Sequence, residues 1–190
     1  MASTTPDLSP AQAAGLRSAV RGIASLYRAA ACSVAVLTPD ADGLRFVAAH
    51  GEGEAQITGV TVSRGTGIAG WVASSGTTLA VTDVQRDPRF ALETARSTGY
   101  VPTTILAAPL LGDDGEAIGV TEVLDPTARE RDLDLLALVG SLLALPLAQI
   151  RPRSSALQDA VDAMEALGPD AEELAVALLR TLAAHEGRRR

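Results

Sequence analysis

The chain has 190 residues, of which 47% are hydrophobic and 3% aromatic, and a formal net charge of -7. This length suits one domain with a helical extension and is too short for a two-domain dehydrogenase. The negative charge argues against general binding of nucleic acid, which needs a basic face. Every Lys or Arg position is an arginine, so the lysine of a phosphate-binding P-loop and Schiff-base chemistry are both excluded.

The sequence holds a single cysteine, Cys32. One cysteine excludes an internal disulfide and a zinc site built on cysteine pairs, and we expect neither a metal nor a cofactor. It also favours a reducing, cytoplasmic location. Residues 1–9 lack the basic start and apolar run of a signal peptide, and we expect them to be disordered. No stretch approaches the roughly 20 uninterrupted apolar residues of a membrane span.

The first predicted element is a helix that begins at the capping pair Ser9 and Pro10 and continues to about Ala30. Apolar residues with heptad-type spacing form a single stripe along it. The stripe consists of Leu16, Val20, Ile23, Tyr27 and Ala30.

Strand-like runs follow the first helix. Residues 32–38 and 44–49 lie on either side of turn-forming residues, and together they predict a β-hairpin. The strand at 32–38 is apolar on both sides, so we expect both faces of its sheet to be covered. Further strands are predicted at residues 59–63, 78–83, 103–111 and 117–125, the last two joined by the turn GDDGE. Pro109 predicts a bulge or a missing ladder bond. Residues 84–102 read as a long loop with short helical turns, and such loops are often functional.

A broad leucine-rich face predicts a helix from Arg131 to about Ile150, which Pro146 should kink or end. Residues 151–155 then form a polar linker. Two short amphipathic stripes in the remainder predict a helical extension that ends at residue 190.

Gly65, Gly67 and Gly70 have the GxGxxG spacing of a dinucleotide-binding loop, and Asp83 stands where the ribose ligand would be. That motif requires a crossover helix of a dozen or more residues between parallel strands. Here Gly76 closes the helical run after about half that length, and the neighbouring strands are hairpin partners. The glycines therefore predict a short helix that starts close against an antiparallel sheet.

Three segments carry a more specific resemblance: GxxGWVAxSG at residues 67–76, DVxxDPRF at 83–90, and the hairpin from APLL to GV at 108–120. In these segments and in their order, residues 10–150 resemble the GAF domain family of small-molecule sensors. The resemblance implies an α+β, PAS-related fold. Its antiparallel sheet of five or six strands would carry the terminal helices on one face and short helices and loops on the other.

The resemblance also implies a ligand pocket on the loop-side face and a dimer contact along the terminal helices. The candidate pocket residues are Trp71, Asp83, Phe90, Tyr100, Thr103, Thr104 and Glu122. The candidate dimer interface comprises Leu16, Val20, Ile23, Tyr27, Leu135, Val139 and Leu142.

Several ligands and activities of this family do not match the chain. The signature of cyclic-nucleotide members is absent after Asp125 and Pro126, and Cys32 is misplaced for bilin attachment. His50, a candidate haem ligand, ends a strand where it can simply face solvent. The methionine sulfoxide reductases of the family need several cysteines, so we expect Cys32 to be a buried, small apolar residue.

We therefore expect a non-catalytic, bacterial-type sensor or regulatory domain that acts as a homodimer on a separate effector protein. One alternative is a ligand-free GAF scaffold for dimerisation and partner docking, and another is a redox enzyme that uses Cys32. A cavity of about 300 Å³ or more with convergent polar groups would favour sensing over the scaffold.

Overall fold

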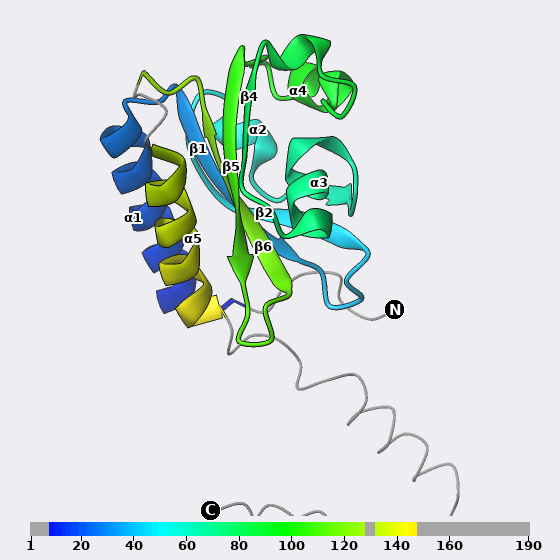
Figure 1. Cartoon of the computed structure of the whole chain (residues 1–190). Coiled ribbons are helices and arrows are strands. Elements are labelled where there is room, and N and C mark those ends of the chain that lie inside the picture. Colours follow the sequence, from blue (N-terminus) through cyan, green and yellow to red (C-terminus); the bar gives the residue numbers. More distant parts are fainter. Residues whose placement is uncertain (1–7, 128–131, 148–190) are drawn as a thin grey trace, which may run out of the picture. The chain divides into compact units, whose positions relative to one another are not determined.

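The computed structural model describes residues 8–127 and 132–147, all of which belong to the first unit of the chain, Met1–Arg151. Six strands form one antiparallel sheet in the order β3-β2-β1-β6-β5-β4 (Figure 1). The strands are β1 (Ala31–Leu37), β2 (Gly43–Gly51), β3 (Thr61–Ser63), β4 (Leu79–Thr82), β5 (Thr104–Leu111) and β6 (Ala117–Leu124). The predicted antiparallel α+β fold is confirmed, whereas the predictions for residues 1–7 and 148–190 lie outside the described residues.

The helices divide between the two faces of the sheet (Figure 1). Helices α1 (Pro10–Tyr27) and α5 (Asp132–Leu147) lie side by side on one face. The opposite face carries the short helices α2 (Glu54–Ile57), α3 (Gly67–Ser75) and α4 (Leu92–Ser97). This arrangement was expected except for α2, which the sequence did not predict.

Helix α1 begins with a reciprocal capping box. The Ser9 hydroxyl accepts a hydrogen bond from the Gln12 backbone N–H, and the Gln12 side chain accepts one from the Ser9 N–H. These bonds satisfy two of the donors that a helix start leaves without intrahelical partners. The helix ends at Tyr27, earlier than predicted, because Arg28 adopts a left-handed conformation with φ of 47°.

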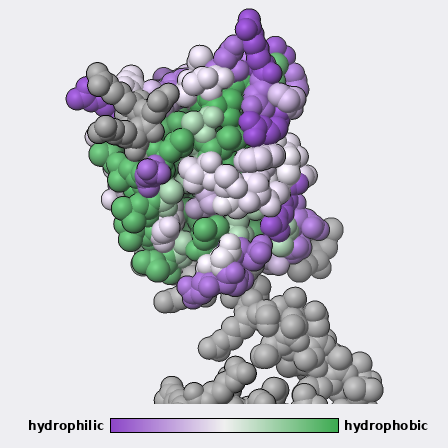
Figure 2. Space-filling view, viewed as in Figure 1, coloured by the Kyte–Doolittle hydropathy of each residue, from purple (hydrophilic) through white to green (hydrophobic). Residues whose placement is uncertain are grey.

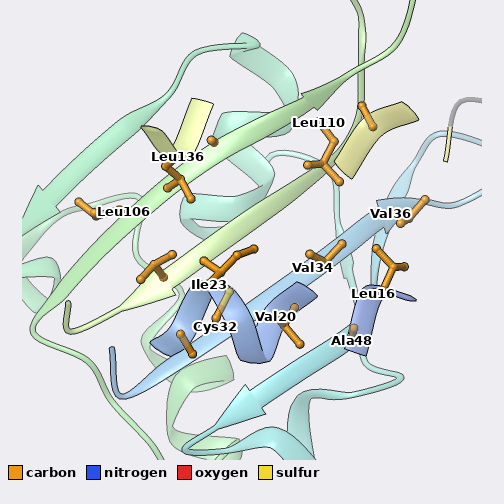
Figure 3. Close-up of a cluster of buried hydrophobic side chains, with 14 of the residues drawn as sticks. Leu16, Val20, Ile23, Cys32, Val34, Val36, Ala48, Leu106, Leu110 and Leu136 are labelled. Carbon is orange, nitrogen blue, oxygen red and sulfur yellow. The ribbon is translucent and has the colours of Figure 1, made fainter. Parts of the chain in front are cut away.

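One hydrophobic core lies between the sheet and the pair α1 and α5. Cys32, Val34 and Val36 alternate along β1 and point into this core (Figure 3). The apolar stripe of α1 packs against these side chains and is thus buried within the same chain. Its members Leu16, Val20, Ile23 and Tyr27 are each at most 5% exposed.

The burial of this stripe corrects only the α1 part of the predicted dimer interface, and the part on α5 (Leu135, Val139 and Leu142) stays a prediction. The heptad spacing on α1 was interpreted as a seam for a second subunit, but the sheet of the same chain already covers it. Burying one such large apolar side chain contributes about 1.5–3 kcal/mol to folding. Residues committed to the intrachain core in this way are not available to a partner unless the domain repacks.

A second core lies between the other face of the sheet and helix α3. It contains Ala35 and Val120 from the central strands together with Ile68 and Val72 from the helix. Both faces of the sheet are therefore covered, as the two-sided apolar pattern of residues 32–38 predicts. Gly70 allows the turn before α3 to pack closely, because a Cβ at this position would lie 2.7 Å from the backbone nitrogen of Gly65.

Helix α5 packs against β5 and leaves a row of leucines uncovered. A Cβ at Gly140 would lie 2.8 Å from the carbonyl oxygen of Pro109, so the helix and the strand approach closely there. The predicted irregularity near Pro109 is present as a register shift between Leu110 and Leu111. Hydrophobic side chains gather on the side of the molecule where α1 and α5 lie (Figure 2). The exposed large apolar residues of this side are Leu26, Leu135, Leu138, Leu142 and Leu145.

Candidate ligand-binding cavity

A cavity of about 100 Å³ lies on the face of the sheet opposite to α1 and α5, bordered by residues of α2, α3, α4 and the sheet. Most of its wall is apolar. The larger apolar side chains are Phe46, Ile57, Ile68, Phe90, Ile105 and Leu124, and the polar ones are Ser33, Glu52, Thr66, Thr94, Thr98, Tyr100 and Glu122.

Glu122 places a carboxyl group in the wall of this cavity. It lies on the central strand β6, where it pairs with Ser33 of β1 on one side and Ala107 of β5 on the other. Its neighbours Thr121 and Val123 alternate toward the α1 side, so the Glu122 side chain belongs to the α3 side. The residue is only 9% exposed.

The carboxyl group of Glu122 meets the beginning of helix α3. It accepts a hydrogen bond from the backbone N–H of Ala69, in the first turn of that helix. The N-cap residue Thr66 makes no side-chain capping bond, so a carboxyl from a distant strand takes that role. Burial raises the pKa of Glu122 to about 7, and the hydrogen bond from Ala69 lowers it only in part. Desolvation of the charged form thus outweighs the favourable helix terminus.

Tyr100 and Asp125 hold one side of the cavity in place. The Tyr100 hydroxyl donates a hydrogen bond to one oxygen of Asp125. The other carboxyl oxygen accepts from the backbone N–H groups of Thr103 and Thr104, at 2.9 and 2.8 Å. Burial, followed by the bond to Asp125, raises the pKa of Tyr100 to about 12. This arrangement, the Tyr100–Asp125 latch, ties the loop after α4 to the end of β6.

The cavity brings together three of the seven predicted pocket residues, namely Phe90, Tyr100 and Glu122. The structure places the other four outside its wall, which corrects that part of the prediction. Thr103 and Thr104 lie at the N-terminal end of β5, where their backbone N–H groups donate hydrogen bonds to Asp125.

Trp71 and Asp83 lie away from the cavity for different reasons. The Trp71 ring packs beneath the Arg89 guanidinium, whose central carbon lies 4.7 Å from the ring centroid. This is cation–π geometry, and Asp87 orients the arginine through hydrogen bonds of 2.9 and 2.7 Å. Asp83 follows β4, and its exposed carboxylate lies 3.3 Å from the Nε atom of Arg86.

Asp125 and Ser33 are among the site residues that were missed from the sequence. Asp125 was considered only for the absence of a cyclic-nucleotide signature, although an aspartate directly after a strand and before a proline is a signal for local backbone capping. Ser33 was read as part of an apolar strand. A lone polar residue within ACSVAVL could have marked the side of β1 that borders the cavity.

Cys32 is buried, as predicted, and is a free thiol. It borders the cavity by its position on β1, but its side chain packs in the core against α1 (Figure 3). Burial raises the pKa of the Cys32 thiol to about 12. Such a thiol remains protonated near neutral pH and is a poor nucleophile.

Over residues 8–127 and 132–147, no group of three or more His, Cys, Asp or Glu side chains is placed to hold a metal ion. His50 is partly exposed, with its Nδ1 atom 3.5 Å from a carboxylate oxygen of Glu54. In the same described part of the chain, none of the helices is long and apolar enough to cross a membrane.

Comparison with known proteins gives one consistent family. The family model described as GAF domain matches residues 14–147. Among curated proteins, the chain is 38% identical over 69 residues to a dual 3',5'-cyclic-AMP and -GMP phosphodiesterase 11A of Takifugu rubripes. It is 41% identical over 66 residues to the corresponding phosphodiesterase 11 of Drosophila melanogaster. These matches cover 36% and 35% of this chain but only 8% and 4% of the two phosphodiesterases.

Solved structures share the fold at low sequence identity. The GAF domain of a phosphoenolpyruvate-protein phosphotransferase from Coxiella burnetii is similar with a TM-score of 0.65 and 18% identity, over 74% of this chain and 84% of that one. A free methionine-R-sulfoxide reductase from Neisseria meningitidis is similar with a TM-score of 0.60 and 19% identity, over 73% and 78% of the two chains.

Proposed function

Because the chain belongs to the GAF domain family of sensor and regulatory domains, we propose that it binds a small molecule in the cavity and relays binding through its terminal helices. The observation that carries this proposal is the buried Glu122 carboxyl in the cavity wall. Burying an ionisable group is costly unless it is paired. A ligand that pairs with Glu122 would recover part of that cost and thus favour one state of the domain.

The relay runs through the central strands. Glu122 borders the cavity on one side of β6, and its neighbour Val123 belongs to the core under α1 and α5 on the other. A shift of β6 on ligand binding would therefore change how these helices pack. A ligand acts in this way only if its affinity differs between the two packings.

We propose that the domain forms a homodimer through α5 rather than through the buried stripe of α1. Leu135, Leu138, Leu142 and Leu145 recur at intervals of three and four residues and are exposed. This is the spacing of a helix–helix seam, and a two-fold axis would place the same row from two subunits face to face.

A ligand-free scaffold is the second candidate, and the size of the cavity favours it. At about 100 Å³ the cavity lies below the 300–1,000 Å³ that is typical of drug-sized ligand sites. It is also smaller than an engineered cavity of about 150 Å³ that binds benzene. Sensing in this conformation is therefore restricted to a compact ligand, and large ligands such as cyclic nucleotides would require the cavity to open.

The proposed role also includes an output partner and a cellular location. We propose that the domain itself is non-catalytic, that it signals to a separate effector protein, and that it works in a reducing cytoplasm, where the free Cys32 would persist. The activity of the whole protein is a separate question, since the chain spans only a small part of the phosphodiesterases that it matches.

Native mass spectrometry of protein purified from its own host tests the proposal. A dimer that retains a low-molecular-mass compound, lost in a Glu122→Gln variant, is the expected result. A dimer that carries no compound and shows no thermal shift with a panel of small metabolites would support the scaffold. A monomer with neither property would contradict both candidates.

A further inference from the structure

The cavity has an unbalanced set of charged groups. Its wall contains two carboxyl groups, Glu122 inside and Glu52 at the exposed rim, and among the residues that the structure describes no arginine or histidine side chain borders it. The chain contains no lysine. The Tyr100 hydroxyl, which also borders the cavity, already donates to Asp125. A negatively charged ligand would therefore meet like charge without a cationic side chain to bind it.

The N-terminus of helix α3 does not make the cavity favourable for an anionic ligand. Helix N-termini attract anions through their free N–H groups. Here the Glu122 carboxyl already accepts from Ala69 in that first turn. A second anion would have to share the helix end with a buried acidic group, and like charges at such close range in a poorly solvated site repel strongly.

Glu122 retains unused acceptor capacity. A carboxylate has two oxygens and about four lone-pair sites. Among the described residues, the Ala69 N–H donates a hydrogen bond to it. The rest of the carboxyl group borders the cavity, where an incoming N–H or N⁺–H donor would form a charge-assisted bond.

From these observations, and resting on the proposed sensor function, we propose that the cavity selects a compact amine, held as its ammonium ion by Glu122 with its apolar part against Phe46 and Ile105. The volume limits the ligand to roughly the size of benzene or smaller. The apolar wall accommodates a short hydrocarbon chain or ring, and the rim carboxylate of Glu52 adds attraction for a cation that enters.

Proton linkage supports the same ligand class. With its pKa raised to about 7, the Glu122 carboxyl is only partly ionised in the empty cavity at neutral pH. An ammonium ion binds the ionised form, so its affinity should increase from pH 6 to pH 8 and then level off. Tyr100 contributes little to this change, because burial and the bond to Asp125 raise its pKa to about 12. The Cys32 side chain packs on the opposite side of the sheet, and Glu52 lies at the exposed rim.

The test uses three probes of similar size and different charge: n-butylammonium, 1-butanol and propionate. Binding to the full chain is measured by calorimetry and by thermal shift at pH 6 and pH 8. We expect n-butylammonium to bind in the millimolar range, more tightly at pH 8, and propionate not to bind. Glu122→Gln should weaken n-butylammonium at least about tenfold and leave 1-butanol unchanged.

The control is Glu116→Gln, which removes an exposed carboxylate in the β5–β6 turn and should leave all three affinities unchanged. Binding of propionate or 1-butanol in preference to n-butylammonium would overturn the amine assignment while leaving a sensor cavity. Failure of all three probes to bind the folded wild-type chain would overturn the amine assignment, whereas small-molecule sensing as such is decided by the native mass spectrometry described above. Equal binding of n-butylammonium by wild type and Glu122→Gln would overturn the role of Glu122.

Discussion

The Tyr100 hydroxyl donates a hydrogen bond to the Asp125 carboxylate, across 25 positions of the chain. Because Asp125 also accepts from two backbone N–H groups at the start of β5, one side chain fastens both the loop after α4 and the strand that follows it. The latch thus holds a wall of the cavity at the end of β6.

We predict that Asp125→Ala destabilises the chain by about 2 kcal/mol, since it removes three hydrogen bonds to a charged acceptor that is only partly buried. Tyr100→Phe should cost about 1 kcal/mol, because the backbone bonds to Asp125 remain. Urea unfolding measures both values. Amide hydrogen exchange should be faster at residues 98–104 in Asp125→Ala, whereas Asp113→Asn in the exposed turn should change neither quantity.

The pH dependence of stability should carry the signature of Glu122. Its folded pKa of about 7 lies above its ordinary value of 4.5, so the folded state binds more protons than the unfolded state between these values. The sign of linkage then requires stability to fall as pH rises from about 4.5 to 7, by up to about 3 kcal/mol. Below pH 4.5 the Glu122 carboxyl is neutral in both the folded and the unfolded state, so folding carries no free-energy penalty for burying its charge.

Glu122→Gln isolates this effect because glutamine cannot ionise. The difference in free energy of unfolding between the variant and wild type should grow in favour of the variant from pH 5 to pH 8. A difference that is constant over this range would show that Glu122 titrates normally in the folded chain.

A matched pair of glycine substitutions tests the close approach before α3. Gly70→Ala should destabilise by about 1–3 kcal/mol, because its Cβ would lie 2.7 Å from backbone that must then shift. Gly22→Ala makes the same chemical change on α1, where a Cβ meets nothing within 4 Å. It should stabilise by about 0.5–1 kcal/mol through helix propensity. Thermal unfolding distinguishes the two, and equal effects would contradict the packing explanation.

The exposed leucine row of α5 gives a prediction about assembly. Leu142→Gln should convert the proposed dimer to monomer in size-exclusion chromatography with light scattering, with a change of less than about 1 kcal/mol in monomer stability, because this side chain is 57% exposed. Leu111→Gln replaces another exposed leucine at the end of β5 and should leave the dimer intact. If both variants behave like wild type, the interface lies elsewhere.

Much of the fold could be predicted because its signals are local. The capping pair Ser9 and Pro10, the turn GDDGE and the short run after Gly70 each act within a few residues, and the helix, the hairpin and the short helix that they predict are present. Helix α2 was missed because its four residues lack an apolar period and follow the N-cap Gly53, which has a left-handed conformation with φ of 72°. The heptad stripe of α1 was identified correctly, but its partner was not, because spacing alone does not distinguish a second subunit from the sheet of the same chain.

The candidate site was less predictable for a related physical reason. Apolar residues occupy both faces of the central strands, so alternation does not reveal which face Glu122 borders. Its contact with Ala69 joins β6 to the start of α3, and the Tyr100–Asp125 latch joins a loop to a strand end. The order of residues thus specified the strands, the hairpin turns and the helices other than α2. Packing across the sheet was needed to bring a carboxyl group to a helix terminus and to leave space beside it, because such contacts depend on distances between segments far apart in the chain.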